Sequence, residues 1–193
     1  MEQIVIFLTV LIVIVVGFLM YEKKSNEVEM VESRVDGYKY LVQKMPDNKT
    51  AADLIAKTKA RLIKLVDYCE LEYPNNNDIK RMCKKFNPNN ITEVGKNSKY
   101  TSYSVNKGEK LVLCLRSRDG LNKLIDENTL TFVAVHELAH IMTKSIGHTE
   151  EFWRNFKFLL ENAIKINIYT KVDYSKHPKP YCGIKVTDTP LNM

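Results

Sequence analysis

His136-Glu137-Leu138-Ala139-His140 is the stretch that decides how this chain folds and what chemistry it can carry. Residues four apart project from the same face of a helix, so the two imidazoles can bind one cation at the usual Zn–N distance of about 2.0–2.1 Å. Glu137 then lies beside the open coordination position, where it can accept a proton from an activated water molecule and later donate it. The spacing predicts a catalytic zinc site of the HExxH type, against the alternative of hydrogen-bonded core histidines on a buried helix.

The sequence before this motif is typical of a buried helix. Residues 130–135 are apolar on nearly every side of a helix. Asp126 is a suitable N-cap. After the motif we expect one or two more helical turns that end at Gly147, because glycine tolerates the left-handed conformation of a helix end.

A third ligand is expected directly after this helix. His148 stands immediately before Thr149, which is a candidate N-cap for the following helix, and a ligand at such a helix entrance is geometrically reasonable. The alternative is a surface histidine at the cap, with Glu150 or Glu151 as the third ligand, since carboxylates also complete catalytic zinc sites. His177 lies in a proline-flanked stretch and is expected in a solvated loop.

Three segments together resemble the WLM family of zinc metallopeptidases, which are relatives of the SprT-like proteases. These segments are Val105-Asn106-Lys107-Gly108-Glu109-Lys110-Leu111-Val112-Leu113-Cys114-Leu115-Arg116, the HELAH helix, and Gly147-His148-Thr149-Glu150-Glu151-Phe152-Trp153. The resemblance covers about residues 100–160. It implies that His136, His140 and His148 bind Zn²⁺ and that Glu137 is catalytic.

The same resemblance implies an α+β zincin-like fold, in which helices accompany a small sheet or hairpin that precedes the HExxH helix. The sequence agrees, because residues 99–105 and 110–116 are typical of strands and are separated by a turn signal at residues 106–109. In zincin-like folds the edge strand of this hairpin can hold an extended substrate.

Further elements follow from periodicity and from turn residues. Helices are predicted at residues 50–73, with a capping signature from Thr50 to Asp53, and at residues 78–86. A last long helix carries an apolar stripe expected to pack in the core, formed by Phe152, Phe156, Leu159, Leu160 and Ala163. Residues 181–187 are expected to form a short strand. Tyr181 is a candidate for stabilising an oxyanion near the metal.

The N-terminus predicts a membrane anchor. Residues 4–20 contain no charged side chain and are about long enough to span the hydrocarbon core of a bilayer. A cleaved signal peptide is the alternative, but Glu2 replaces the usual basic residue and no small-residue cleavage site follows. We therefore expect a transmembrane anchor at residues 1–21, a charged juxtamembrane stalk at 22–38 and one zincin-like domain at 39–193.

The charges beside the anchor predict its orientation. Lys23 and Lys24 follow the apolar segment, so the positive-inside rule places the catalytic domain on the cytosolic side, or in the interior of a virion. The arrangement of anchor, domain and Tyr-Cys-Gly-Ile ending resembles uncharacterised WLM-like proteins of large DNA viruses. Reduced thiols are expected for the four widely spaced cysteines, although an even number permits two disulfides.

The net charge of +6 fits a solvated basic surface better than a nucleic-acid site, because the basic residues lack interleaved aromatic residues. The sequence therefore predicts a membrane-anchored zinc metallopeptidase that hydrolyses peptide bonds in a protein or peptide substrate. One alternative is a non-catalytic membrane adaptor with a degenerate or structural metal site. Another is a protease for DNA–protein crosslinks, as the better-known relatives are. The sequence leaves the oligomeric state open.

Overall fold

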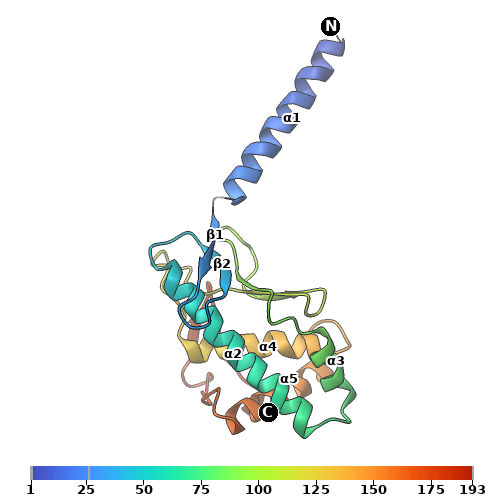
Figure 1. Cartoon of the computed structure of the whole chain (residues 1–193), viewed down its shortest axis with the longest axis vertical. Helices are drawn as coiled ribbons and strands as arrows, with labels where there is room; N and C mark the ends of the chain where they lie inside the picture. Colours follow the sequence, from blue (N-terminus) through green and yellow to red (C-terminus); the bar gives the residue numbers. More distant parts are fainter. Residues whose placement is uncertain (1, 26, 193) are drawn as a thin grey trace.

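The computed structural model describes residues 2–25 and 27–192 and consists of a long helix and a mixed α+β domain (Figure 1). Helix α1 (Glu2–Ser25) projects away from the domain. The domain contains four more helices, namely α2 (Asn48–Glu72), α3 (Asn77–Lys85), α4 (Glu127–Met142) and α5 (Glu150–Lys165). The helices predicted from periodicity are confirmed, with ends that differ by a few residues.

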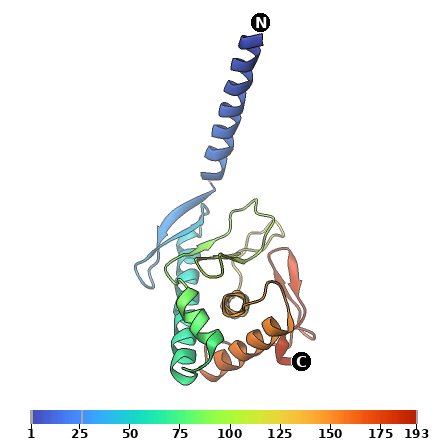
Figure 2. The same cartoon turned by 90° about the vertical axis from the view of Figure 1, so that its right-hand side faces the viewer.

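Helix α4, which carries the HELAH motif, is the centre of the domain. Figure 2 looks along its axis and shows α2, α3 and α5 around it. The strands that precede α4 lie above it in this view, and the C-terminal hairpin lies on the side opposite α2. Twelve of its sixteen residues are buried. A helix that is apolar on nearly every side must be surrounded to remove that surface from water, and this explains its central place.

A three-stranded sheet precedes α4 in the chain, in the order β3 (Ile91–Glu93), β5 (Lys110–Leu113) and β4 (Tyr103–Val105). Strands β4 and β5 form the predicted antiparallel hairpin, with Ser104 opposite Leu111. Strand β3 pairs with β5 in parallel. Strand β4 is thus at the edge of this sheet, and it lies against α4.

Two small hairpins complete the domain. Strands β1 (Val28–Glu32) and β2 (Lys39–Gln43) are antiparallel and pack beside α2. Residues 28–32 fall inside the predicted stalk, yet they belong to the folded domain, because pairing with β2 satisfies their backbone groups. At the other end, β6 (Lys179–Tyr181) pairs with β7 (Ile184–Val186), and a short 3₁₀ helix, η1 (Pro190–Asn192), follows.

The helix caps confirm some predictions and correct others. The Asp126 carboxylate accepts a hydrogen bond from the Thr129 amide at 2.9 Å, so it is the predicted N-cap of α4. The prediction that this helix continues to Gly147 is wrong, because α4 ends at Met142. The predicted capping role of Asp53 is also wrong: its carboxylate instead accepts hydrogen bonds from Arg34.

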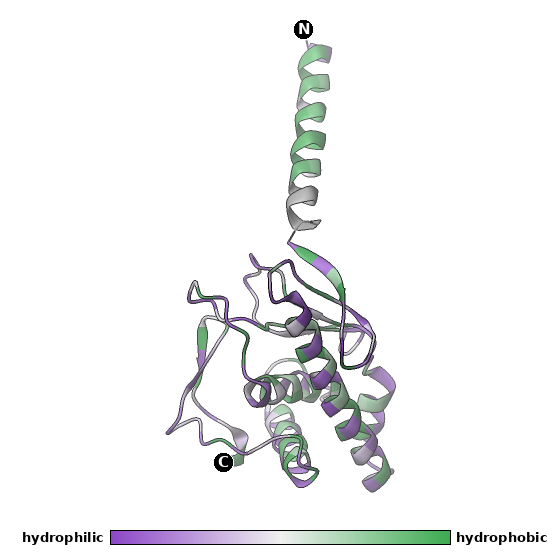
Figure 3. Cartoon of the chain, turned by 60° about the vertical axis from the view of Figure 1, so that its left-hand side comes forward, coloured by the Kyte–Doolittle hydropathy of each residue, from purple (hydrophilic) through white to green (hydrophobic). Residues whose placement is uncertain are grey.

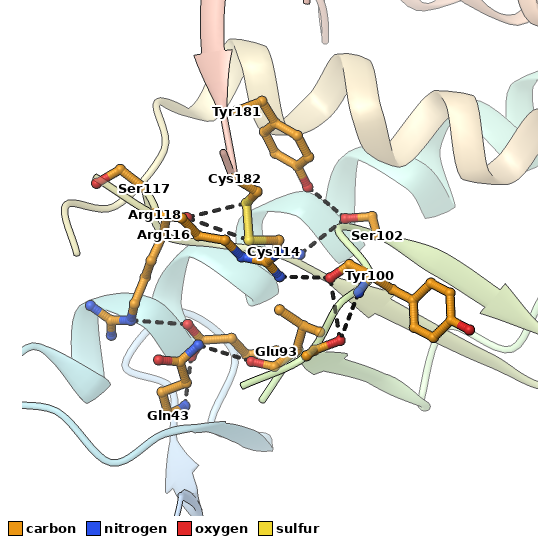
Figure 4. Close-up of a disulfide and its surroundings, with 12 residues drawn as sticks. Gln43, Glu93, Tyr100, Ser102, Cys114, Arg116, Ser117, Arg118, Tyr181 and Cys182 are labelled. Atoms are coloured by element: carbon orange, nitrogen blue, oxygen red, sulfur yellow. Dashed lines mark hydrogen bonds and ion pairs between the residues drawn. A yellow bond between two sulfur atoms is a disulfide. The ribbon is translucent and has the colours of Figure 1, made fainter. Parts of the chain in front are cut away.

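Cys114 and Cys182 form a disulfide, which contradicts the prediction that all four cysteines are reduced. The two residues are 68 positions apart in sequence, but the β6–β7 hairpin folds back onto the end of β5 and brings their Cα atoms within 6.3 Å (Figure 4). That separation is within the range that a disulfide can bridge. Cys69 and Cys83 are free.

A buried ion pair lies near the same strand end. The guanidinium of Arg116 donates to the Glu93 carboxylate at 2.9 Å, and both side chains are almost fully buried. Glu93 also accepts a hydrogen bond from the backbone N–H of Gln43 at 2.6 Å, and Arg116 donates to Asp47 at 2.7 Å. These contacts connect β2, β3 and the start of α2.

Helix α1 has the length and composition of a membrane span. Its residues 2–19 have a mean hydropathy of 2.7, and none of that stretch is buried against the domain. Figure 3 shows that α1 is hydrophobic along most of its length, whereas hydrophilic and hydrophobic residues are mixed along the helices and strands of the domain.

Candidate metal centre

Three imidazoles converge at the C-terminal half of α4. The Nε2 atom of His136 lies 3.2 Å from Nε2 of His140 and 3.1 Å from Nε2 of His148. In a tetrahedral zinc site with Zn–N bonds of about 2.0–2.1 Å, two ligand nitrogens are about 3.3 Å apart. The donor set and its spacing therefore fit a zinc ion held by these three residues.

Aromatic side chains of α5 support the three imidazoles. The buried ring of Phe152 stacks on His140, with ring centroids 4.3 Å apart, and meets His136 and His148 edge-on. The ring of Phe156 also meets His136 edge-on, with ring centroids 5.1 Å apart. These contacts restrict the rotation of the rings, so the donor atoms are held in place by packing.

The segment that carries His148 is fixed by a lysine. The ammonium of Lys107, in the β4–β5 turn, donates to the carbonyls of Thr143, Lys144 and Ser145 at 2.7–2.8 Å. It replaces the helical partners that these carbonyls would otherwise need, which explains why α4 ends before Gly147. Lys107 was missed by sequence reasoning, because its role depends on contacts with residues 36 to 38 positions away.

The turn that presents Lys107 requires a glycine. Gly108 has a φ of +118°, and a Cβ atom at this position would lie 2.4 Å from the carbonyl oxygen of Lys85. A larger residue would displace the turn from α3, and with it the Lys107 ammonium.

The carboxylate of Glu151 holds the same segment through its amides and a hydroxyl group. It accepts hydrogen bonds from the amides of Lys144 and Ser145 at 3.0 and 3.1 Å and from the Ser145 hydroxyl at 2.7 Å. These bonds lower the pKa of Glu151 to about 2. The third residue that the structure brings to the histidine pair is His148, and Glu151 is occupied elsewhere. Glu150 and His177 are both exposed.

Burial determines the protonation of the site. Burial, with the neighbouring imidazoles, lowers the pKa of His136 to about 3, and burial, with His148 and Lys107, lowers that of His140 to about 4. Both rings are therefore neutral at pH 7, the state in which imidazole binds metal. Burial raises the pKa of Glu137 to about 7, although a hydrogen bond from the Ser104 backbone opposes this shift.

Tyr181 lies on the β6 side of Glu137. Its hydroxyl is 2.5 Å from the Ser102 hydroxyl, which also accepts a hydrogen bond from the Cys114 amide at 3.0 Å (Figure 4). Burial is the main cause of the raised pKa of Tyr181, and the nearby Glu137 carboxylate adds to it. The phenol is thus protonated and can donate a hydrogen bond.

Comparisons with known proteins agree with this architecture. The family model described as "WLM domain" matches residues 78–190. "Uncharacterized protein R325" of Acanthamoeba polyphaga mimivirus is 34% identical over 190 residues, which cover 96% of each chain. "Uncharacterized protein 136R" of Invertebrate iridescent virus 6 is 32% identical over 97 residues, covering 50% of this chain and 53% of that one.

The fold is also found in a solved structure. The crystal structure of Wss1 from Saccharomyces cerevisiae superposes with a TM-score of 0.50 and 20% identity, and covers 65% of this chain and 86% of that one. The similarity confirms the mixed α+β fold. With its family match and its viral relatives, the chain belongs to the WLM family of metallopeptidase-like proteins, as represented in large DNA viruses.

Proposed function

We propose that this protein is a membrane-anchored, zinc-dependent peptidase. The observation that carries the proposal is the convergence of three imidazoles beside Glu137, a buried carboxylate that follows His136 on α4. His136, His140 and His148 would hold the zinc ion. When bound, zinc supplies a Lewis acid that polarises the scissile carbonyl and acidifies a water molecule.

Glu137 is the proposed general base and acid. Its carboxylate follows His136 on the same helix and has a pKa of about 7 in the metal-free protein, so it can exchange a proton near neutral pH. It would take the proton of the attacking water and pass it to the leaving amine. A purely structural metal site has no use for a buried carboxylate at this position, and this argues against the adaptor alternative.

Tyr181 is the proposed donor to the oxyanion. Its hydroxyl is buried, close to Glu137 and held by Ser102, so it needs little reorganisation when charge develops on the carbonyl oxygen. The disulfide at the next residue holds this tyrosine against the end of β5.

The edge strand β4 is the proposed docking site for the substrate backbone. An extended peptide that pairs with β4 gains main-chain hydrogen bonds, which require little sequence selectivity. Because the Ser104 backbone contacts Glu137, such a peptide would pass the carboxylate.

Helix α1 is the proposed anchor. A helix of 24 residues is about long enough to cross a bilayer, and Lys23 and Lys24 at its end favour a domain on the cytosolic side or inside a virion. We propose a single-pass protein that acts on protein substrates near that membrane.

Hydrolysis of an unfolded protein by the full chain in lipid nanodiscs tests the activity. Cleavage should require added zinc, should stop with a chelator, and should be absent from Glu137→Gln. Cleavage that persists equally in Glu137→Gln would contradict the proposed role of Glu137. Salt-dependent binding of DNA by the same preparation would instead favour the crosslink-protease alternative.

A further inference from the structure

A pocket of about 230 Å³ opens beside Glu137 and His136. Its other lining residues come from α4, α5, the segment before β4 and the C-terminal hairpin, namely Thr101, Phe132, Val133, Trp153, Phe156, Tyr181, Ile184, Lys185, Val186, Thr187 and Asp188. A larger cavity of about 740 Å³ lies between the β1–β2 hairpin and the sheet, and it contains none of the three histidines.

The lining of the smaller pocket includes both buried apolar residues and exposed residues. Phe132, Val133 and Phe156 are buried, while Ile184 and Lys185 are exposed. Pockets for drug-sized ligands are about 300–1,000 Å³, so this volume fits one amino-acid side chain better than a whole small molecule. An apolar side chain that enters this pocket would lose contact with water, while the exposed lining residues would stay hydrated.

The wall opposite α4 is the C-terminal hairpin, which is joined covalently to the sheet. Tyr181 of β6 and Ile184 and Val186 of β7 contribute to the pocket, and the Cys182 sulfur is bonded to Cys114 at the end of β5. The disulfide therefore fixes the distance between the hairpin and the sheet (Figure 4).

We propose that this pocket binds one large apolar side chain of the protein substrate, next to the scissile bond, and that the disulfide-held hairpin forms its selective wall. The inference rests on the proposed peptidase function and adds the substrate class. The lining favours aromatic and long aliphatic residues. A preference of at least about 10-fold over glycine at one subsite is expected, because a single methylene group in an apolar pocket is already worth about 10- to 200-fold.

The only tryptophan of the chain, Trp153, lines the pocket and reports binding without any catalysis. The full chain in lipid nanodiscs, free of metal, is titrated with N-acetyl-phenylalaninamide and with N-acetyl-glycinamide while Trp153 emission is followed. The phenylalanine compound should give a saturable change, and the glycine compound should give none.

Val186→Asp is the principal variant, because it places a carboxylate on the apolar wall, where burial without a partner is costly. Val35→Asp is its matched control, since Val35 is 50% exposed and lies outside the pocket. Val186→Asp should abolish the Trp153 response and Val35→Asp should keep it. Reduction of the disulfide should weaken the response, because the wall is then free to move.

Cleavage sites in an unfolded protein, mapped by mass spectrometry, complete the test. The wild-type chain should show one subsite enriched in large apolar residues, and Val186→Asp should lose that enrichment. Cleavage without such enrichment, together with a silent Trp153, would overturn the pocket assignment and leave the peptidase intact. A saturable Trp153 response in a zinc-loaded chain that cleaves nothing would overturn the peptidase and, with it, the role of the pocket as a substrate subsite.

Discussion

The domain contains two clusters of polar side chains that differ in their burial and in the charges that they bring together. In the first, the charges of Arg116 and Glu93 compensate each other, and the backbone N–H of Gln43 donates a further hydrogen bond to Glu93. In the second, His136, His140 and His148 direct their Nε2 atoms at one another, so three similar groups face a common point. The opposite charges of the first cluster compensate each other, although Nη2 of Arg116 has no hydrogen-bond partner among the described residues. The second cluster has no such opposite charge and offers lone pairs to a cation.

This difference separates a structural cluster from a functional one. Burial raises the pKa of Glu93. A hydrogen bond from the backbone N–H of Gln43 and the charge of the Arg116 guanidinium oppose that shift. Near Glu137 the opposing contribution is one backbone hydrogen bond, and its pKa rises to about 7. Burial without an internal counter-charge is the property expected of groups that act on a ligand.

The largest effect is expected from Glu137→Gln. It removes the proton acceptor but leaves the three imidazoles, so the rate of peptide hydrolysis should fall about 10²- to 10⁴-fold with zinc retained. Glu150→Gln, an exposed neighbour on α5, is the control and should keep full activity. Loss of zinc from Glu137→Gln would show that the carboxylate holds the metal and does not move protons.

Breaking the buried Arg116–Glu93 ion pair should destabilise the fold. Arg116→Met leaves Glu93 buried and unpaired, which should lower the free energy of unfolding by about 3–5 kcal/mol, measured by urea denaturation. His136→Ala should cost less in the metal-free protein, because it leaves no unpaired buried charge. The reverse order of stabilities would remove the distinction between the two clusters.

Tyr181→Phe tests whether the hydroxyl of Tyr181, beside the metal site, takes part in catalysis. If the hydroxyl stabilises the oxyanion, kcat should fall about 10²-fold or more while KM changes little. Ser102→Ala should give a smaller loss, because it removes the partner that orients this hydroxyl but keeps the donor. An unchanged kcat in Tyr181→Phe would restrict the residue to packing.

The disulfide should contribute to stability through the closed loop of the chain. Replacing Cys114 and Cys182 by serine should lower the free energy of unfolding by about 2–4 kcal/mol, and a reductant should have the same effect on the wild-type chain. Cys83→Ser is the control, since this cysteine is free. Equal stability with and without reductant would show that the pair is not bonded in solution.

The remaining predictions concern pH, where the expected effect is small per pH unit. The pKa of His136 falls from 6.5 to about 3 on folding, so between pH 6.5 and 4 the unfolded chain binds a proton that the folded chain refuses. Stability of the metal-free protein is therefore lost as the pH falls through this window. His136→Ala should remove about 1.4 kcal/mol per pH unit from that slope.

Glu137 acts in the opposite direction. Its pKa rises from 4.5 to about 7 on folding, so its contribution to stability is present below pH 4.5 and is lost as the pH rises to 7. Glu137→Gln should therefore make the rise of stability between pH 4.5 and 6.5 steeper. Thermal or urea unfolding of both variants at several pH values measures the two slopes, and parallel curves would contradict these assignments.

The parts of the structure that depend on local sequence were predictable. Asp126 caps α4 through an amide three residues away, and the β4–β5 hairpin is set by adjacent strands and their turn. The four residues of the proposed site could also be named from spacing and family resemblance.

The parts that sequence reasoning missed depend on distant contacts. Lys107 ends α4 from another element, and the Cys114–Cys182 bond joins segments that no spacing rule connects. Asp53 had a suitable position for a cap, but Arg34 offered its carboxylate a stronger, charged partner. Strand β1 was hidden by its charged residues, since its pairing with β2 involves the backbone.

Metal content of the purified full chain, measured by mass spectrometry after incubation with zinc and removal of the excess, tests the central claim most directly. Wild type, His136→Ala and Glu137→Gln are compared. The account predicts about one zinc per chain in wild type and Glu137→Gln, and none in His136→Ala. A well-folded wild-type chain that binds no metal would contradict it.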